Sequence, residues 1–182
     1  LSKVASEYGG MYISHLRSEG TNLLEALEEL ISISRNANIP AEVYHLKASR
    51  EPNWSKLDDV IKRIEEVRKE GLQITADIYT YNASSTGLTG VIPTWVQEGG
   101  HRAWINRMKD PEVRPRLLAD IREQLDEQPP EGILLVGFKT SKMSRKYLAK
   151  TVAEAAAMRG QTPEEAIVDM VIEDDHRIQC IY

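Results

Sequence analysis

The feature that most constrains the fold is a strand-forming stretch that recurs at intervals of about 32 residues in the first half of the chain. The stretches are residues 10–16 (GMYISHL), 42–48 (EVYHLKA) and 74–80 (ITADIYT), and a segment with helical periodicity lies between each pair. Alternation of this kind indicates parallel strands joined by right-handed crossover connections. The sequence therefore predicts an α/β fold in which these strands lie together in a sheet or barrel.

Both intervening segments carry an apolar stripe with the spacing of three and four residues that is typical of an amphipathic helix. The stripes are Leu24, Leu27, Ile31 and Ile33 in the first segment, and Leu57, Val60, Ile61, Ile64 and Val67 in the second. Thr21 and Ser55 are the expected N-caps, and Gly71 stands where a glycine commonly ends a helix. We expect both stripes to lie in the core.

Two histidines stand at equivalent places in this repeat. In a parallel α/β fold the functional groups gather at the C-terminal ends of the strands, where His15 and His45 lie. Neighbouring strands are about 5 Å apart, so the two imidazoles could bind one metal ion or serve as hydrogen-bonded structural residues. The other histidines, His101 and His176, have no recognisable partner in the sequence and are expected at the surface.

Lys47 and Tyr79 follow the same strand ends. Lys47 comes two residues after His45, and side chains two apart on a strand point to the same face. A lysine there is either a solvated charge or a cation that binds a carboxylate. Tyr79 either packs, with its hydroxyl bonded nearby, or lines a site.

The second half of the chain has a different character. Residues 86–176 are predicted to form a mainly helical insertion or small domain, between a barrel segment at residues 1–85 and a truncated barrel strand at residues 177–182. The elements expected in this half are helices at 101–110, 111–127 and 146–159, a strand at 132–138, and a helix that begins at Pro163 behind the cap Thr162.

Composition limits the classes of partner. The formal net charge is −5 and there is no long block of like charges, so we expect no nucleic-acid binding. No apolar run reaches the roughly 18 residues that a membrane helix needs, so we expect no membrane partner. Cys180 is the only cysteine, which favours a reducing, cytoplasmic location. The chain opens without Met or a signal peptide, and we expect it to be a segment of a longer protein.

The motifs YGGMYISHLRSEG, EVYHLKAS and ADIYTYNASSTGL in combination resemble the D-aminoacylases, the N-acyl-D-amino-acid deacylases of the amidohydrolase superfamily. The later segment YLAKTVAEAAAMRGQTPEEAIVDMVIEDD is similar to a helical part of the same family. The resemblance implies a partial (β/α)8 TIM-barrel-type fold of a metal-dependent hydrolase, with parallel strands and a mostly helical insertion.

The resemblance also implies roles for individual residues. His15 and His45 match two zinc ligands on consecutive strands, Lys47 matches the lysine that meets the substrate α-carboxylate, and Tyr79 matches a tyrosine that contacts the substrate. Thr80 stands where the family often has proline. The general-base aspartate and the remaining zinc ligands of the family are expected outside this chain.

The function implied is zinc-dependent hydrolysis of the amide bond of N-acyl-D-amino acids, small molecules that would be the substrate. Without the missing ligands and base, we expect the isolated segment to be inactive, and its open strand edges to allow oligomerisation. Two alternatives stay open. One is a cyclic amidase of the same superfamily, similar to a hydantoinase or dihydroorotase, and the other is a non-catalytic α/β module that only mediates association.

Overall fold

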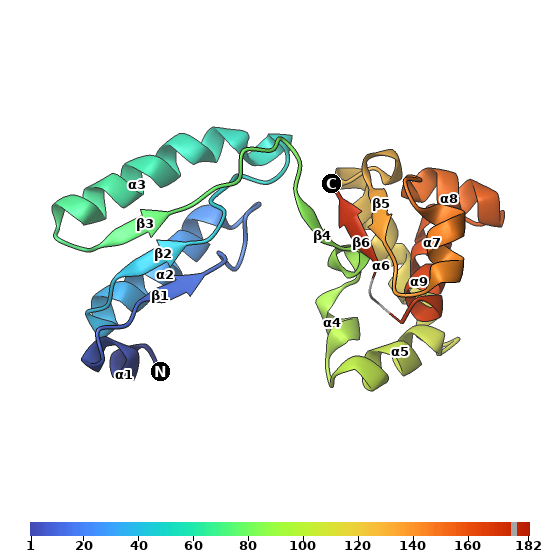
Figure 1. The fold of residues 1–182 in the computed structure, drawn as a ribbon, viewed down its shortest axis with the longest axis horizontal. Helices are drawn as coiled ribbons and strands as arrows, with labels where there is room; N and C mark the ends of the chain where they lie inside the picture. The colour runs from blue at the N-terminus through green and yellow to red at the C-terminus, as the bar shows by residue number, and fades with distance from the viewer. Residues whose placement is uncertain (176–177) are drawn as a thin grey trace. The chain divides into compact units, whose positions relative to one another are not determined.

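The computed structural model describes residues 1–175 and 178–182, and the chain divides into two compact units, Leu1–Thr80 and Tyr81–Tyr182 (Figure 1). Each unit has its own core of buried apolar side chains. Over the part of the chain that the structure describes, no helix has both the length and the apolar character needed to cross a membrane.

The first unit is built on a parallel sheet, as the sequence predicted. Its strands are β1 (Tyr12–Ser14), β2 (Ala41–Val43) and β3 (Ile74–Ala76), and they pair in the order β1-β2-β3. The register aligns Ser14 with Val43 and Val43 with Ala76, so all three strands end at the same level. The chain segments that follow these strands therefore leave the sheet at one edge.

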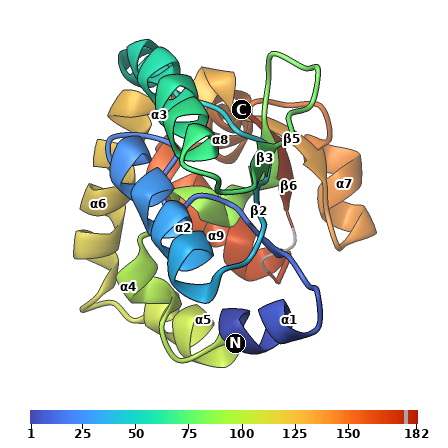
Figure 2. The ribbon, with the colours of Figure 1, turned by 90° about the vertical axis from the view of Figure 1, so that its left-hand side faces the viewer.

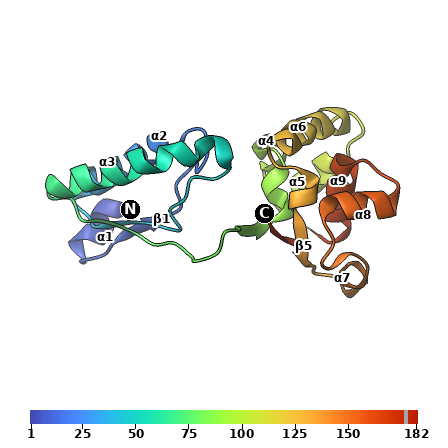
Figure 3. The same cartoon turned by 90° about the horizontal axis from the view of Figure 1, so that it is seen from above.

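Helices cover one face of this sheet. The helical elements are α1 (Ser2–Glu7), α2 (Leu23–Ala37), the 3-10 helix η1 (Glu51–Lys56) and α3 (Leu57–Lys69). Figures 2 and 3 show α2 and α3 side by side on the same side of the strands. The predicted stripe residues Leu27, Ile31, Val60 and Val67 are fully buried. Burial of such a side chain stabilises the fold by about 1.5–3 kcal/mol.

Several details of the predicted helices were wrong. The N-caps are Asn22 in α2 and Lys56 in α3, and neither makes a side-chain capping bond. Ser55 lies inside η1, which runs directly into α3, so it does not stand at a helix start. Ile61 is 45% exposed because it lies at the edge of the stripe that Val60 forms. Gly71 does follow the end of α3 with a φ of 98°, the conformation that favours glycine.

The second unit combines a small antiparallel sheet with most of the helices. Its elements are β4 (Ser85–Gly87), η2 (Leu88–Val91), α4 (Thr94–Gln97), α5 (His101–Lys109), α6 (Arg114–Glu127), η3 (Pro130–Gly132), β5 (Leu134–Gly137), α7 (Ser141–Tyr147), α8 (Val152–Arg159), α9 (Pro163–Glu173) and β6 (Gln179–Ile181). The strand order is β4-β6-β5, and both pairings are antiparallel. Helices α8 and α9 pack against each other (Figures 1 and 3).

The end of the chain belongs to this second sheet. In residues 178–182, β6 pairs with β4 and β5, so it shares a unit with the predicted insertion at residues 86–176. The predicted division into a barrel segment, an insertion and a last barrel strand stays a prediction.

The helix predicted at residues 146–159 was wrong, because it is two helices, α7 and α8. Between them Ala149 adopts a positive φ of 60°, and its N–H donates to the carbonyl of Leu135 at 2.8 Å. The N–H of Leu135 in turn donates to the carbonyl of Lys150. These bonds to β5 take the backbone out of the helical path.

His101 lies at the surface as predicted, but it has partners that the sequence did not indicate. Its Nε2 contacts a carboxylate oxygen of Asp175, and its Nδ1 accepts a hydrogen bond from Trp104 at 3.0 Å. Lys139 binds the other oxygen of Asp175. Hydrogen bonds from Lys139 and His101 lower the pKa of Asp175 to about 2. His176 lies outside the described residues.

Thr162 caps α9 as predicted and generates a test of local stability. Its Oγ1 accepts from the N–H of Glu165, and the Glu165 carboxylate accepts from the N–H of Thr162, which forms a capping box. Replacing Thr162 with Ala should lower the free energy of unfolding by about 1 kcal/mol, measured by chemical denaturation. The matched control is Thr21→Ala, because Thr21 makes no capping bond at α2 and should change stability by less than about 0.5 kcal/mol. Equal losses in both variants would contradict this assignment.

Candidate functional site

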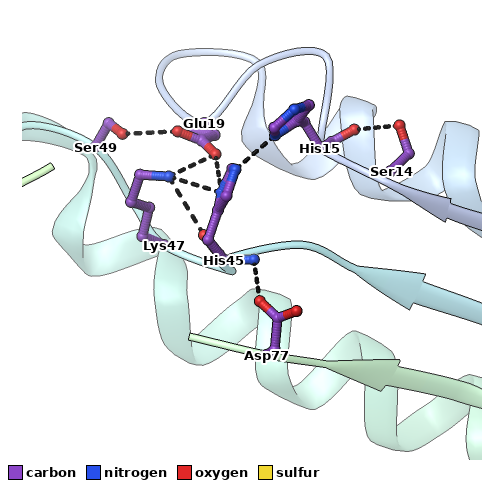
Figure 4. A network of polar contacts seen from close by, with 7 residues as sticks. All are labelled: Ser14, His15, Glu19, His45, Lys47, Ser49 and Asp77. Carbon is purple, nitrogen blue, oxygen red and sulfur yellow. Dashed lines mark hydrogen bonds and ion pairs between the residues drawn. The ribbon is translucent and has the colours of Figure 1, made fainter. Parts of the chain in front are cut away.

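A group of polar side chains lies at the common C-terminal edge of the parallel sheet (Figure 4). His15 is the first residue after β1, His45 is the second after β2, and Asp77 is the first after β3. Because the strands end at the same level, these three residues start from neighbouring positions. The sheet register therefore assembles the site.

The two histidine rings face each other with a nitrogen of each at the point of closest approach. His15 Nδ1 lies 2.5 Å from His45 Nε2, and the ring centroids are 4.6 Å apart. At this distance one of the two nitrogens donates a hydrogen bond to the other, and which of them donates depends on the tautomers of the rings. A neutral imidazole nitrogen is a common zinc ligand, and these two could bind one cation if the rings moved apart, because two ligands about 2.0–2.1 Å from a tetrahedral zinc lie roughly 3.3 Å from each other.

The backbone at His45 adopts an unusual conformation, and Asp77 stabilises it. His45 has a positive φ of 38°, a region that costs a non-glycine residue about 1–3 kcal/mol. Its N–H donates to Asp77 Oδ1 at 2.5 Å, and the next N–H, of Leu46, donates to the carbonyl of Asp77 at 2.8 Å. These bonds offset the strain. The expectation that His45 and Lys47 share one face of a strand was wrong, because β2 ends at Val43.

Lys47 nevertheless lies beside His45, since the turn brings its side chain back. Lys47 Nζ is 2.9 Å from His45 Nδ1 and donates to the carbonyl of His45 at 3.3 Å. It also forms an ion pair with Glu19, with 2.7 Å between Nζ and Oε1. Glu19 Oε1 is itself 2.9 Å from His45 Nδ1. Glu19, His45 and Lys47 therefore form a closed triangle of polar contacts.

Tyr79 completes the group on the side of β3. Its ring centroid lies 6.4 Å from that of His45, and Lys47 Nζ lies 5.7 Å from the Tyr79 centroid. The ammonium group is within the range of a cation–π interaction with this ring. The structure thus brings together all four residues singled out in the sequence: His15, His45, Lys47 and Tyr79.

Two further residues of the site were not found from the sequence. Asp77 could have been, because it directly follows β3 as His15 follows β1. Glu19 lies in the loop after β1, four residues beyond His15, and strand periodicity says nothing about such a position. It meets Lys47 and His45 only because the loop folds over the sheet edge.

Two imidazole nitrogens are what this site could offer to a metal ion. Over residues 1–175 and 178–182, no cluster of three or more His, Cys, Asp or Glu side chains is arranged to hold an ion. A zinc site has about four ligands, so the other positions would be taken by water, substrate or residues of a longer protein. Cys180 lies buried in the second unit, where burial raises the pKa of its thiol to about 12.

Comparison with known proteins identifies relatives with a defined activity. No family model matches the chain. An N-acyl-D-glutamate deacylase of Alcaligenes xylosoxydans xylosoxydans is 31% identical over 86 residues, which is 47% of this chain and 18% of that protein. A D-aminoacylase of the same organism is 34% identical over 83 residues, which is 46% of this chain and 17% of that protein.

Solved structures extend the similarity over the whole chain. The N-acyl-D-glutamate deacylase of Bordetella bronchiseptica, in complex with zinc and a phosphonate inhibitor, has a TM-score of 0.70 at 21% identity and matches 100% of this chain. A D-aminoacylase variant in complex with copper chloride has a TM-score of 0.65 at 21% identity and matches 99% of the chain. The fold of the chain is therefore that of a part of these proteins.

The chain spans 18% of the first curated relative and 30% of the first solved structure. The sequence motifs, the curated relatives and the solved structures agree on one group of proteins. The resemblance predicted from the motifs is thus confirmed: the chain is similar to an N-acyl-D-glutamate deacylase and to D-aminoacylases, and it corresponds to a part of these proteins.

Proposed function

We propose that the protein containing this chain is a zinc-dependent hydrolase that cleaves the amide bond of N-acyl-D-amino acids. The observation that carries the proposal is the convergence of His15 Nδ1 and His45 Nε2 at 2.5 Å, next to a half-buried ammonium group. The relatives support it, because they are named as deacylases of D-amino-acid derivatives, and one was solved with zinc. In this proposal residues 1–85 are a segment of a (β/α)8 barrel.

His15 and His45 are proposed to hold the metal with the ring nitrogens that face each other. The chemistry that zinc supplies when bound at such a site is a water molecule with a pKa near neutrality and a polarised amide carbonyl. The role of the protein is to hold both imidazole rings in place before the substrate binds. The bond from His45 N–H to Asp77 does this for the backbone of the second ligand.

Lys47 is proposed to bind the α-carboxylate of the substrate. Its ammonium group has three donors, and its side chain is 21% exposed, so it is reached from solvent but partly desolvated. Lys47 Nζ lies 2.9 Å from His45 Nδ1, so a substrate carboxylate bound to Lys47 would lie close to the metal held by His45. The scissile amide would then be fixed near the metal. Tyr79 lies against the same ammonium and would limit where the substrate side chain rests.

The remaining parts of the reaction are proposed to come from the rest of the longer protein. These are the general-base aspartate and the further metal ligands that the relatives' family implies. On this account residues 1–182 alone are inactive, and residues 86–176 are an insertion in the sequence between two barrel strands. The reducing, cytoplasmic location inferred from the single cysteine stays a prediction.

The direct test compares N-acetyl-D- and N-acetyl-L-amino acids as substrates of the full-length protein, with and without added zinc. We expect zinc-dependent turnover of the D-substrates alone. Hydrolysis of cyclic amides in preference to linear ones would instead indicate the cyclic amidase. The absence of turnover of linear and cyclic amides in the presence of zinc would contradict the proposal and favour a non-catalytic module.

Replacing His45 with Ala in the full-length protein should lower both the zinc content and kcat/KM for the D-substrate. Removal of a group that only supports a metal ligand costs up to about a hundredfold in activity. Removal of the ligand itself should therefore cost more than about a hundredfold. Zinc content is measured by elemental analysis. The control is His101→Ala, which removes an exposed imidazole from the second unit. Retention of zinc and activity in His45→Ala would show that His45 is not a ligand.

Replacing Lys47 with Met should raise KM for substrates with a free α-carboxylate by about tenfold or more, since a hydrogen bond between charged groups is worth about 1.5–3 kcal/mol. Substrates whose carboxylate is blocked as an amide should change far less. Lys62→Met is the matched control, because Lys62 lies on the exposed face of α3. An equal loss for free and blocked substrates would contradict the assigned role.

A further inference from the structure

Glu19 is the charged side chain in the site to which the proposed function gives no role. We propose that Glu19 is a positioning residue for the metal: its carboxylate accepts the Nδ1–H of His45 and so keeps the Nε2 lone pair directed toward His15. The inference rests on the proposed function, because it assumes that His45 binds the metal through Nε2. It concerns how that ligand is held.

His45 Nδ1 has two neighbours with opposite requirements. Lys47 Nζ and Glu19 Oε1 both lie 2.9 Å from it. An ammonium group only donates, so a bond from Lys47 would require a lone pair on Nδ1 and would leave the ring proton on Nε2. A carboxylate only accepts, so a bond to Glu19 requires the proton on Nδ1 and leaves the lone pair on Nε2. Only the second arrangement can bind a metal through Nε2.

The contacts around Lys47 favour the bond to Glu19. Glu19 Oε1 is 2.7 Å from Lys47 Nζ, and this pair of opposite charges has a Coulomb attraction that a bond to a neutral imidazole lacks. Lys47 also donates to the carbonyl of His45 at 3.3 Å. Two of its three donors therefore have oxygen acceptors, and it does not need the imidazole. Without Glu19, the nearest acceptor for this ammonium would be Nδ1.

The loop that follows β2 holds Glu19 in place. The N–H of Ser49 donates to the carbonyl of Glu19 at 2.8 Å, and Ser49 Oγ donates to Oε2 at 3.3 Å. The side chains of Glu19, His45 and Lys47 are only 21–28% exposed, so water competes weakly for their bonds. Figure 4 shows the carboxylate between Ser49 and the His45 ring, on the side of the ring away from His15.

Other carboxylates nearby have different partners. Asp77 meets the backbone N–H of His45 and not its ring. Glu29 forms an exposed ion pair with Arg17, with 2.6 Å between Oε1 and Nη2. Glu29 belongs to the same unit as Glu19 and carries the same charge, but its partner is Arg17 and not the His45 ring. It provides the matched control for Glu19.

The test uses the full-length protein and measures the zinc dissociation constant by competition with a chromogenic chelator. Glu19→Met and Glu19→Gln have about the same size, but only Gln keeps an acceptor for Nδ1–H. We expect Glu19→Met to weaken zinc binding by about 10- to 100-fold, as is typical when the partner of a metal-binding histidine is removed. Glu19→Gln should lose clearly less, and Glu29→Met should match the wild type.

Unchanged affinity in Glu19→Met, or an equal loss in Glu19→Met and Glu19→Gln, would overturn the inference, the latter because it would leave only the charge to explain the effect. Circular dichroism establishes that the variants are folded. If Glu19→Met is not folded, Glu19→Ala takes its place with the same expectations. A wild-type protein that binds no zinc would overturn the proposed function as well, which separates that failure from a failure of the role of Glu19 alone.

Discussion

Three short parallel strands end at the same level in the sheet, and the site depends on this register. Ser14, Val43 and Ala76 stand opposite one another, so the residues that follow them leave the sheet together. A shift of one residue in one strand would turn every following side chain to the other face. Helices α2 and α3 stabilise this register, because their buried side chains pack against one face of the sheet.

On this framework the structure fixes one residue, His45, from three directions. Asp77 binds its backbone, Glu19 and Lys47 lie at one ring nitrogen, and His15 faces the other. The positive φ of His45 is strained, and such strain persists only where the surroundings determine the conformation. If His45 binds a metal in the full-length protein, its backbone would need little reorganisation.

The sequence predicted the parts of this arrangement that follow from periodicity. Alternating strands and helices gave the parallel sheet, and position at a strand end singled out His15 and His45. The turn at His45 was not predictable, because histidine adopts a positive φ only rarely, although more often than most residues, and no glycine marks the position. Glu19 was missed because a loop residue has no periodic signal. In the second unit, β4 and β6 pair although about 95 residues separate them, and local patterns do not encode such contacts.

The measurement that tests the central claim most directly is anomalous X-ray diffraction at the zinc edge from crystals of the full-length protein. The account predicts a zinc peak within about 2.0–2.1 Å of both His15 Nδ1 and His45 Nε2. A well-ordered site with no peak between the two rings, or zinc bound to other residues while these histidines bond to each other, would contradict it.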